Sequence, residues 1–165
     1  MKLYPFFFIA LCCFTPEELQ AQVSDSSGMK LRNTVYLDIA TFVFGGNASI
    51  NFEAPFGEHT LLRCGYGFGY LVQFDNGTVY SSGLLAMMNF VTSGNNSRFE
   101  GGIGGSFVQI NRSTNIFLSA GSKLLPSFAI GYRYQPQTGG FVFRIGLGYT
   151  YAFGAPLYIS LGSTI

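Results

Sequence analysis

Charged residues are scarce in this 165-residue chain, which has 9 Lys and Arg, 8 Asp and Glu, and a formal net charge of +1. The charged fraction is 10%, whereas the surface of an ordinary soluble domain is roughly 25 to 35% charged. A soluble domain would therefore have too little charge to cover itself. The balance also leaves no basic stripe for nucleic acid and no acidic tail for a cationic partner.

Cysteine and histidine are almost absent, with 3 Cys and 1 His. Cys12 and Cys13 lie in the leader described next, so Cys64 is the only cysteine in the rest of the chain. An intramolecular disulfide and a zinc site of Cys and His ligands are therefore excluded. The single histidine, His59, lies in a short polar connection, and we interpret it as a solvated turn residue. We predict no catalytic, cofactor-binding or metal-binding residue.

The first 22 residues have the organisation of a secretory signal peptide. Lys2 gives a positive start, residues 3–14 form an apolar core, and a polar stretch ends at Ala21 and Gln22, near which we expect cleavage. The core is shorter than the ~18 residues of a spanning helix, which disfavours a retained anchor. Leu11 precedes Cys12 where lipoproteins place a small residue, which disfavours lipidation. We therefore predict a cleaved leader at 1–22, a polar lead-in at 23–33 and one domain at 34–165.

After residue 14 no apolar run approaches the ~18 residues of a spanning helix, although 48% of the residues are hydrophobic and 17% are aromatic. Large apolar and small or polar residues alternate instead. Between Phe141 and Tyr151, every second residue from Phe141 is large and apolar, and Arg144, Gly146 and Gly148 lie between them. Only helices and closed barrels satisfy the backbone in lipid. Strands of about 9 to 11 residues with a period of two are typical of outer-membrane barrels.

Eight alternating stretches follow one another along the chain. We place them at residues 34–44, 47–55, 60–72, 78–92, 97–110, 124–135, 140–152 and 156–165. Turn signals separate them, such as Gly45-Gly46-Asn47 and Asp75-Asn76-Gly77. Eight is an even number and gives the smallest class of single-chain bacterial barrels. We predict an all-β fold, an eight-stranded antiparallel up-and-down transmembrane β-barrel in the outer membrane of a Gram-negative bacterium. With the termini in the periplasm, the longest connection, Asn111 to Lys123, faces outward.

If the apolar faces contact lipid, the opposite faces point into the lumen. This rule directs one charged residue from each of six strands inward: Asp38, Glu53, Arg63, Glu100, Arg133 and Arg144. An unpaired charge in a narrow lumen costs several kcal/mol, whereas hydrogen-bonded pairs are tolerated. We interpret these three acids and three bases as a structural ion-pair plug rather than a proton or ion path. Glycines on the same faces are expected to leave room for the arginines: Gly65, Gly67, Gly69, Gly102, Gly104, Gly146 and Gly148.

Aromatic residues on the outward faces are expected to contact outer-membrane lipid and to form two interfacial girdles. They are Tyr66, Phe68, Tyr70, Phe74, Tyr80, Phe90, Phe128, Tyr132, Tyr134, Tyr149, Tyr151 and Phe153. The other partner that we expect is the outer-membrane insertion machinery, during biogenesis. No specific ligand and no cofactor follows from the sequence.

Four segments carry a family resemblance: Ile50–Glu53, Phe99–Gly104, Gly131–Gln135 and Gly140–Gly146. They resemble segments of uncharacterised small outer-membrane barrels common in Bacteroidota-type bacteria, and the resemblance covers nearly all of the mature chain. It implies that these segments lie on the second, fifth, sixth and seventh strands, with the acids and arginines in them turned inward. It implies no activity.

The sequence thus predicts a barrel with a charge-plugged lumen and a structural, adhesive or envelope-stabilising role, without catalysis. Two main alternatives stay open, together with a narrow pore as a smaller one. An outer-leaflet lipid-modifying enzyme needs Ser, His and a carboxylate together at the outer rim, whereas His59 is expected on the inner side. A soluble lipocalin-like ligand carrier needs apolar side chains inside and charges outside.

Overall fold

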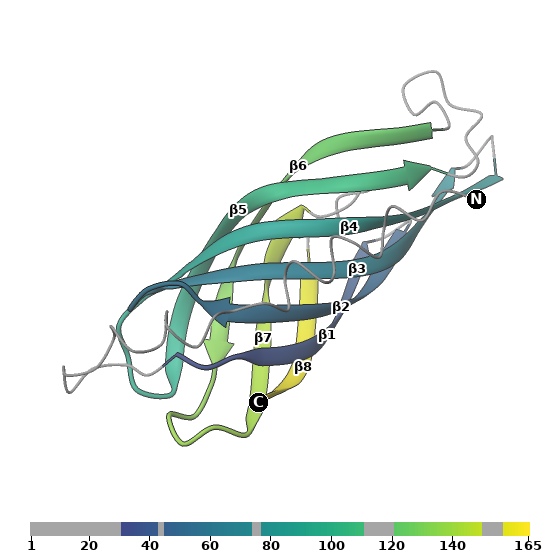
Figure 1. The fold of residues 1–165 in the computed structure, drawn as a ribbon. Coiled ribbons are helices and arrows are strands. Elements are labelled where there is room, and N and C mark those ends of the chain that lie inside the picture. The colour runs from purple at the N-terminus through teal and green to yellow at the C-terminus, as the bar shows by residue number, and fades with distance from the viewer. Residues whose placement is uncertain (1–30, 43–44, 74–76, 111–120, 150–156) are drawn as a thin grey trace.

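The computed structural model describes residues 31–42, 45–73, 77–110, 121–149 and 157–165. Within them lie eight strands: β1 (Thr34–Phe42), β2 (Gly45–Pro55), β3 (Thr60–Gln73), β4 (Gly77–Val91), β5 (Ser97–Ile110), β6 (Gly121–Tyr134), β7 (Phe141–Tyr149) and β8 (Leu157–Thr164). Each strand pairs antiparallel with the next, and β1 pairs with β8, so the sheet closes into a barrel (Figure 1). The predicted eight-stranded antiparallel up-and-down barrel is confirmed. None of the described residues forms a helix long and apolar enough to cross a membrane.

The predicted leader at 1–22 and most of the lead-in at 23–33 lie outside the described residues. Three short connections, at residues 56–59, 92–96 and 135–140, lie at the end of the barrel that holds Thr34 and Thr164, which we call the terminal end. We call the opposite end the far end. In the last of these connections Gly139 and Gly140 have φ of 91° and 101°, in the left-handed region that glycine adopts most easily.

Two predicted turn segments belong to strands instead. Gly45 and Gly46, predicted in the first hairpin turn, begin β2 and pair with the end of β1. Residues 121–123, predicted in the longest connection, begin β6 and pair with residues 108–110 of β5. Glycine and, to a lesser degree, lysine are poor strand formers by local preference. Backbone pairing with the neighbouring strand therefore makes both segments part of a strand rather than of a turn.

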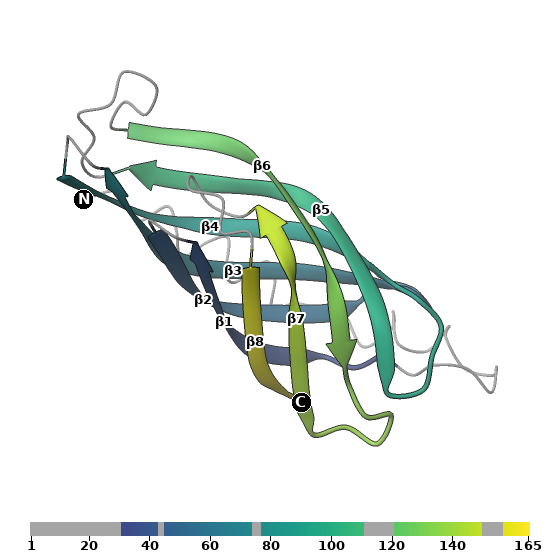
Figure 2. The same cartoon turned by 180° about the vertical axis from the view of Figure 1, so that it is seen from behind.

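Strands β3 to β6 are longer than the others, with 14, 15, 14 and 14 residues against 9 in β1 and 8 in β8. At the far end β4, β5 and β6 extend beyond β7 and β8 (Figures 1 and 2). Strand β6 pairs with β5 along its length, and its pairing with β7 within the described residues runs from Phe128 to Tyr134.

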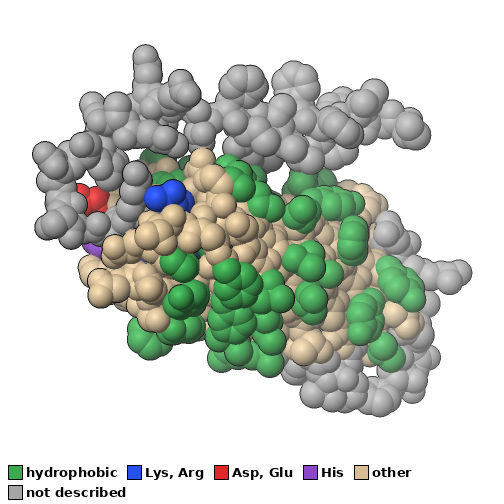
Figure 3. Space-filling model, turned by 90° about the horizontal axis from the view of Figure 1, so that it is seen from below, with side chains coloured by type: hydrophobic (Ala, Val, Ile, Leu, Met, Phe, Trp, Pro, Cys, Tyr) green, Lys and Arg blue, Asp and Glu red, His purple; other side chains and the backbone are tan. Residues whose placement is uncertain are grey.

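The outer face of the barrel is apolar and the charges are inside. Large hydrophobic side chains are exposed at alternate positions, for example Leu37 and Ile39 on β1 and Phe99 and Ile103 on β5. Figure 3 shows hydrophobic side chains across one face, with charged side chains and histidine only near one end. Among the charged residues in the described ranges, Glu58 alone is exposed. This distribution is the reverse of a soluble ligand-carrying barrel and is that of a transmembrane barrel.

The outward aromatic residues lie as the alternation predicts wherever their side chains are described. Tyr66, Phe68, Tyr70, Tyr80, Phe90 and Phe128 are exposed, and Tyr132 and Tyr134 are half-buried. Tyr132 packs edge-on against Phe99, with ring centroids 6.4 Å apart. Phe74, Tyr151, Phe153 and the side chain of Tyr149 lie outside the described part. The arrangement in two girdles stays a prediction.

The buried side chains of the lumen are mainly polar or charged toward the terminal end and apolar toward the far end. Along β5, Arg98 and Glu100 come first from the terminal end, and Val108 and Ile110 come last. The zone toward the far end is a hydrophobic cluster of Ala40, Val79, Leu85, Met87, Val108, Ile110, Ala129 and Tyr158. Leu31, Leu61 and Val91 form a smaller cluster at the terminal end.

Candidate functional site

All six charged residues predicted to face inward lie buried in the lumen. None is more than 5% exposed, and they come from β1, β2, β3, β5, β6 and β7. The six are Asp38, Glu53, Arg63, Glu100, Arg133 and Arg144. They form two groups, and we call the whole set with its hydrogen-bonding partners the lumen network.

The first group links β1, β2 and β3. Arg63 forms an ion pair with Asp38 through its Nη2 atom. The Nε atom of Arg63 donates to Oδ1 of Asn51 at 3.1 Å, and the amide of Asn51 donates to the hydroxyl of Ser49 at 2.9 Å. A buried arginine is thus held by one carboxylate and one neutral acceptor.

The second group is a ring of two acids and two bases. Arg133 Nη1 lies 2.6 Å from Glu53 Oε2 and 3.4 Å from Glu100 Oε2. Arg144 lies 3.6 Å from Glu53 Oε1 through Nη1 and 2.5 Å from Glu100 Oε1 through Nη2. Each carboxylate therefore contacts both guanidinium groups. Strands β2 and β6 are four places apart in a ring of eight, so the contact between Glu53 and Arg133 crosses the whole bore.

Two buried tyrosines, which the sequence analysis did not single out, connect the charges. The Tyr36 hydroxyl donates to Glu53 Oε1 at 2.7 Å, and the Tyr158 hydroxyl donates to Glu100 Oε1 at 3.0 Å. The Tyr36 ring has the guanidinium carbon of Arg144 4.6 Å and that of Arg63 5.4 Å from its centroid. Cation–π contacts of this kind gain strength when they are desolvated. Tyr36 therefore joins the two groups into one network.

A seventh buried charge, Arg98, lies on β5 and is 2% exposed. It makes no ion pair within the described residues. Its Nη2 atom donates to the carbonyl of Asn95 at 2.7 Å and its Nε atom to that of Gly94 at 3.3 Å. The alternation of the strands predicted three inward acids and three inward bases. With Arg98 the buried bases outnumber the buried acids by one.

The inward glycines leave room mainly for neutral side chains rather than for the arginines. A Cβ atom at Gly146 would lie 2.8 Å from the Tyr158 hydroxyl, and one at Gly131, its partner across β6 and β7, would lie 2.6 Å from it. A Cβ atom at Gly65 or Gly102 would meet an asparagine side chain of the neighbouring strand. The expectation that these glycines make room for arginine is therefore wrong at these positions.

His59 is exposed in the connection between β2 and β3, at the terminal end. Its backbone carbonyl accepts a hydrogen bond from the Val91 amide at 2.8 Å. In the part of the chain that the structure describes, no group of three His, Cys, Asp or Glu residues is placed to hold a metal ion.

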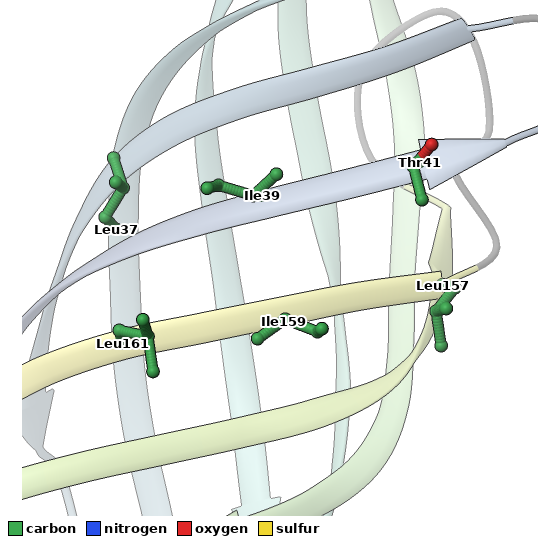
Figure 4. A pocket seen from close by; sticks show the side chains of 6 residues that line it. All are labelled: Leu37, Ile39, Thr41, Leu157, Ile159 and Leu161. Atoms are coloured by element: carbon green, nitrogen blue, oxygen red, sulfur yellow. The ribbon is translucent and has the colours of Figure 1, made fainter.

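A shallow groove of about 190 Å³ follows the seam between β1 and β8 on the outer face. Its lining consists of Leu37, Ile39, Thr41, Leu157, Ile159 and Leu161, in two facing rows (Figure 4). Only Thr41 carries a polar group in its side chain. The groove lies in the apolar belt and has no group that could perform acid–base chemistry.

In comparisons with known proteins, no family model matches the chain, and no curated protein sequence matches it. Among solved structures, the chain is similar to the crystal structure of Ail, the attachment invasion locus protein of Yersinia pestis, with a TM-score of 0.45 and 11% identity. The match covers 84% of this chain and 98% of that chain.

Proposed function

We propose that the protein is an outer-membrane barrel with a sealed lumen, which serves the cell envelope as a structural element and neither conducts ions nor catalyses a reaction. The apolar outer face supports a position within lipid. The observation that carries the sealed lumen is the pairing of Glu53 on β2 with Arg133 on β6 across the bore.

The hydrogen bonds that the Glu53 and Glu100 carboxylates accept support a plug over an ion path. Glu53 Oε1 accepts from Tyr36 and from Asn89, each at 2.7 Å, and its Oε2 accepts from Arg133. Glu100 Oε1 accepts from Arg144 Nε at 2.6 Å and from Tyr158. An ion moving along the bore would have to separate these pairs, and separating a buried pair costs about 3–5 kcal/mol. An eight-stranded barrel is also narrow enough for its own side chains to fill it.

The proposal includes the orientation of the barrel in the outer membrane. The terminal end faces the periplasm, because the longest connection between strands, residues 111–120, lies at the opposite end, and long connections face outward in outer-membrane barrels. The lipid bilayer is the main partner, and the insertion machinery acts during biogenesis. An adhesive function would reside in the far-end connections, which lie outside the described residues. The relationship to barrels of Bacteroidota-type bacteria is likewise a proposal.

Planar-bilayer recording tests the sealed lumen. We expect the purified, refolded protein to give no discrete current steps, whereas a porin measured in the same bilayers gives them. A double variant, Glu53→Ser with Arg133→Ser, removes the contact across the bore and is expected to leak more than the wild type. Regular steps from the wild-type protein would contradict the proposal and favour a narrow pore.

Cell fractionation tests the location separately. We expect the protein in the outer-membrane fraction, and we expect its mobility on a gel to differ between heated and unheated samples. Recovery from the soluble periplasmic fraction would favour the lipocalin-like carrier. The exposed position of His59 at the terminal end gives the lipid-modifying enzyme no support.

A further inference from the structure

Arg98, Arg133 and Gln135, near the terminal end of the lumen, each have a buried nitrogen atom without a hydrogen-bond partner in the described part of the chain. These atoms are Nη1 of Arg98, Nη2 of Arg133 and Nε2 of Gln135. The three side chains are 2%, 0% and 1% exposed. A guanidinium group stays charged in proteins and has no acceptor, and an amide nitrogen only donates. Each of the three atoms therefore requires an acceptor.

Strand register brings the three side chains to one place. Arg98 and Arg133 are direct partners in the ladder between β5 and β6, and directly opposed residues have Cβ atoms about 4.5–5.5 Å apart. Gln135 follows two positions after Arg133, and its backbone amide donates to Asn96 at 2.8 Å. All three side chains are buried on the inner face, beside the connection between β4 and β5.

The orientation of the Gln135 amide is fixed by its neighbour. Arg133 Nε donates to Gln135 Oε1 at 2.9 Å. Reversing the amide would set two donors against each other, because Nε of arginine cannot accept. The NH₂ group of Gln135 therefore points away from Arg133 Nε. The other nitrogens of Arg98 are already bound to backbone carbonyls, and Arg133 Nη1 is bound to Glu53.

The buried charges of the lumen are unbalanced. The lumen holds the bases Arg63, Arg98, Arg133 and Arg144 against the acids Asp38, Glu53 and Glu100. Like charges directly opposite each other on paired strands are destabilising, and an uncompensated buried charge is costly. We propose that the N–H groups of Arg98, Arg133 and Gln135 bind one compact anion of the chloride class, which accepts these donors and neutralises the excess charge.

The place of the site and the strength of its hydrogen bonds agree with this assignment. Arg98 is the second residue of β5 and Gln135 directly follows β6, so the site lies at the terminal mouth of the barrel rather than behind the network. Charge-assisted hydrogen bonds to an anion are about twice as strong as neutral ones. The site goes beyond the proposed envelope role, because a sealed lumen does not require it.

Thermal unfolding of the full chain in detergent tests the site, with chloride varied and sodium gluconate keeping the ionic strength constant. Gluconate is too large for a site of three convergent donors. We expect the apparent melting temperature of the wild type to rise by roughly 3 to 6 °C for each tenfold increase of chloride above its dissociation constant. Arg98→Gln should lose this dependence. Lys123→Gln, which removes a base at the far end of β6, should keep it.

A second measurement does not depend on the variant. Wild-type crystals grown in sodium bromide are expected to show an anomalous peak within hydrogen-bonding distance of Arg98 and Arg133. A wild-type melting temperature that does not change with chloride, or a dependence that Arg98→Gln retains in full, would overturn the proposal. So would bromide crystals without a peak at these residues. A response to phosphate equal to that of chloride would support the site and identify its ligand as any compact anion.

Discussion

Glu53 is the centre of the lumen network, and its replacement by glutamine is the sharpest test of whether the lumen charges form buried ion pairs. The carboxylate is 0% exposed and accepts from Tyr36, Asn89 and Arg133 while lying near Arg144. Glutamine has nearly the same shape and keeps one acceptor oxygen. The substitution therefore removes the charge with little change of volume, and it leaves Arg133 and Arg144 to share the single carboxylate of Glu100.

The expected loss of stability follows from the complete burial of the Glu53 carboxylate. Removing one partner of a buried ion pair costs about 3–5 kcal/mol, because the other charge stays buried without compensation. For a chain of this size each kcal/mol lowers the melting temperature by roughly 2–4 °C. We therefore expect Glu53→Gln to lower it by roughly 6 to 20 °C. Glu58→Gln, in the exposed connection that follows β2, removes the same charge and should change stability by no more than ~0.5 kcal/mol.

The assay must suit the chain, which contains no Trp, so intrinsic tryptophan fluorescence is excluded. Loss of the β circular-dichroism signal, and of the difference in gel mobility between heated and unheated samples, both report unfolding of the barrel. A double variant, Glu53→Gln with Arg133→Met, removes both charges of one pair and should recover more than half of the loss. Equal stability of Glu53→Gln and Glu58→Gln would refute the reasoning, since it would mean that water solvates the lumen charges.

Three further predictions use the same measurements of unfolding. Tyr158→Phe should cost about 1.5–3 kcal/mol, because it removes a hydrogen bond to the charged Glu100. Gly146→Val should destabilise the barrel by about 1–3 kcal/mol through overpacking against the Ile130 carbonyl and the Tyr158 hydroxyl. Combining both changes should cost less than their sum, because Tyr158→Phe removes one of the two crowded contacts. Ile130→Arg, at an outward position that is 66% exposed, should cost about 2–4 kcal/mol in lipid vesicles. Gln137→Arg, in the exposed connection between β6 and β7, should be nearly neutral, whereas a soluble carrier would tolerate both arginines equally well.

The strand count and the inward or outward direction of side chains were predictable, because lipid and lumen demand opposite chemistry at alternate positions. On β7, Phe141 and Leu147 are exposed while Arg144 is buried, as the alternation predicts. Element ends were less predictable. The first residues of β6 have weak strand preference, and Leu124, Leu125 and Pro126 interrupt the alternation there. Only the ladder with β5 shows that the strand begins at Gly121.

The partners within the lumen could not be predicted from alternation, which gives the face of a residue but not its height in the bore. Glu53 and Arg133 are 80 residues apart in the sequence, and their contact depends on the stagger of all the strands between them. Arg98 could have been found, because it shares a face with Glu100. Only Ser97 separates it from the polar segment Ser93–Asn96, and the predicted set contained one inward charge from each of six strands.

Tyr36 and Tyr158 were missed for a different reason. Tyr36 lies two positions before Asp38, and Tyr158 lies two positions before Ser160, so the alternation directs both inward. Aromatic residues are so common on the lipid face of barrels that composition favours an outward position. In these two strands the position in the alternation predicts the direction of the side chain better than the residue type does.

The lumen network also explains how glycine-rich strands keep their register. Strand β5 contains Gly101, Gly102, Gly104 and Gly105, and a stretch without side chains distinguishes poorly between its two faces. A slip by one residue exchanges the faces of the whole strand. It would turn Glu100 toward lipid, where charged residues are costly, and would separate its carboxylate from Arg133, Arg144 and Tyr158. Buried ion pairs are weak contributors to stability compared with apolar packing. Their effect on β5 is therefore to raise the energy of the shifted pairings, so that a strand with few side chains still adopts one register.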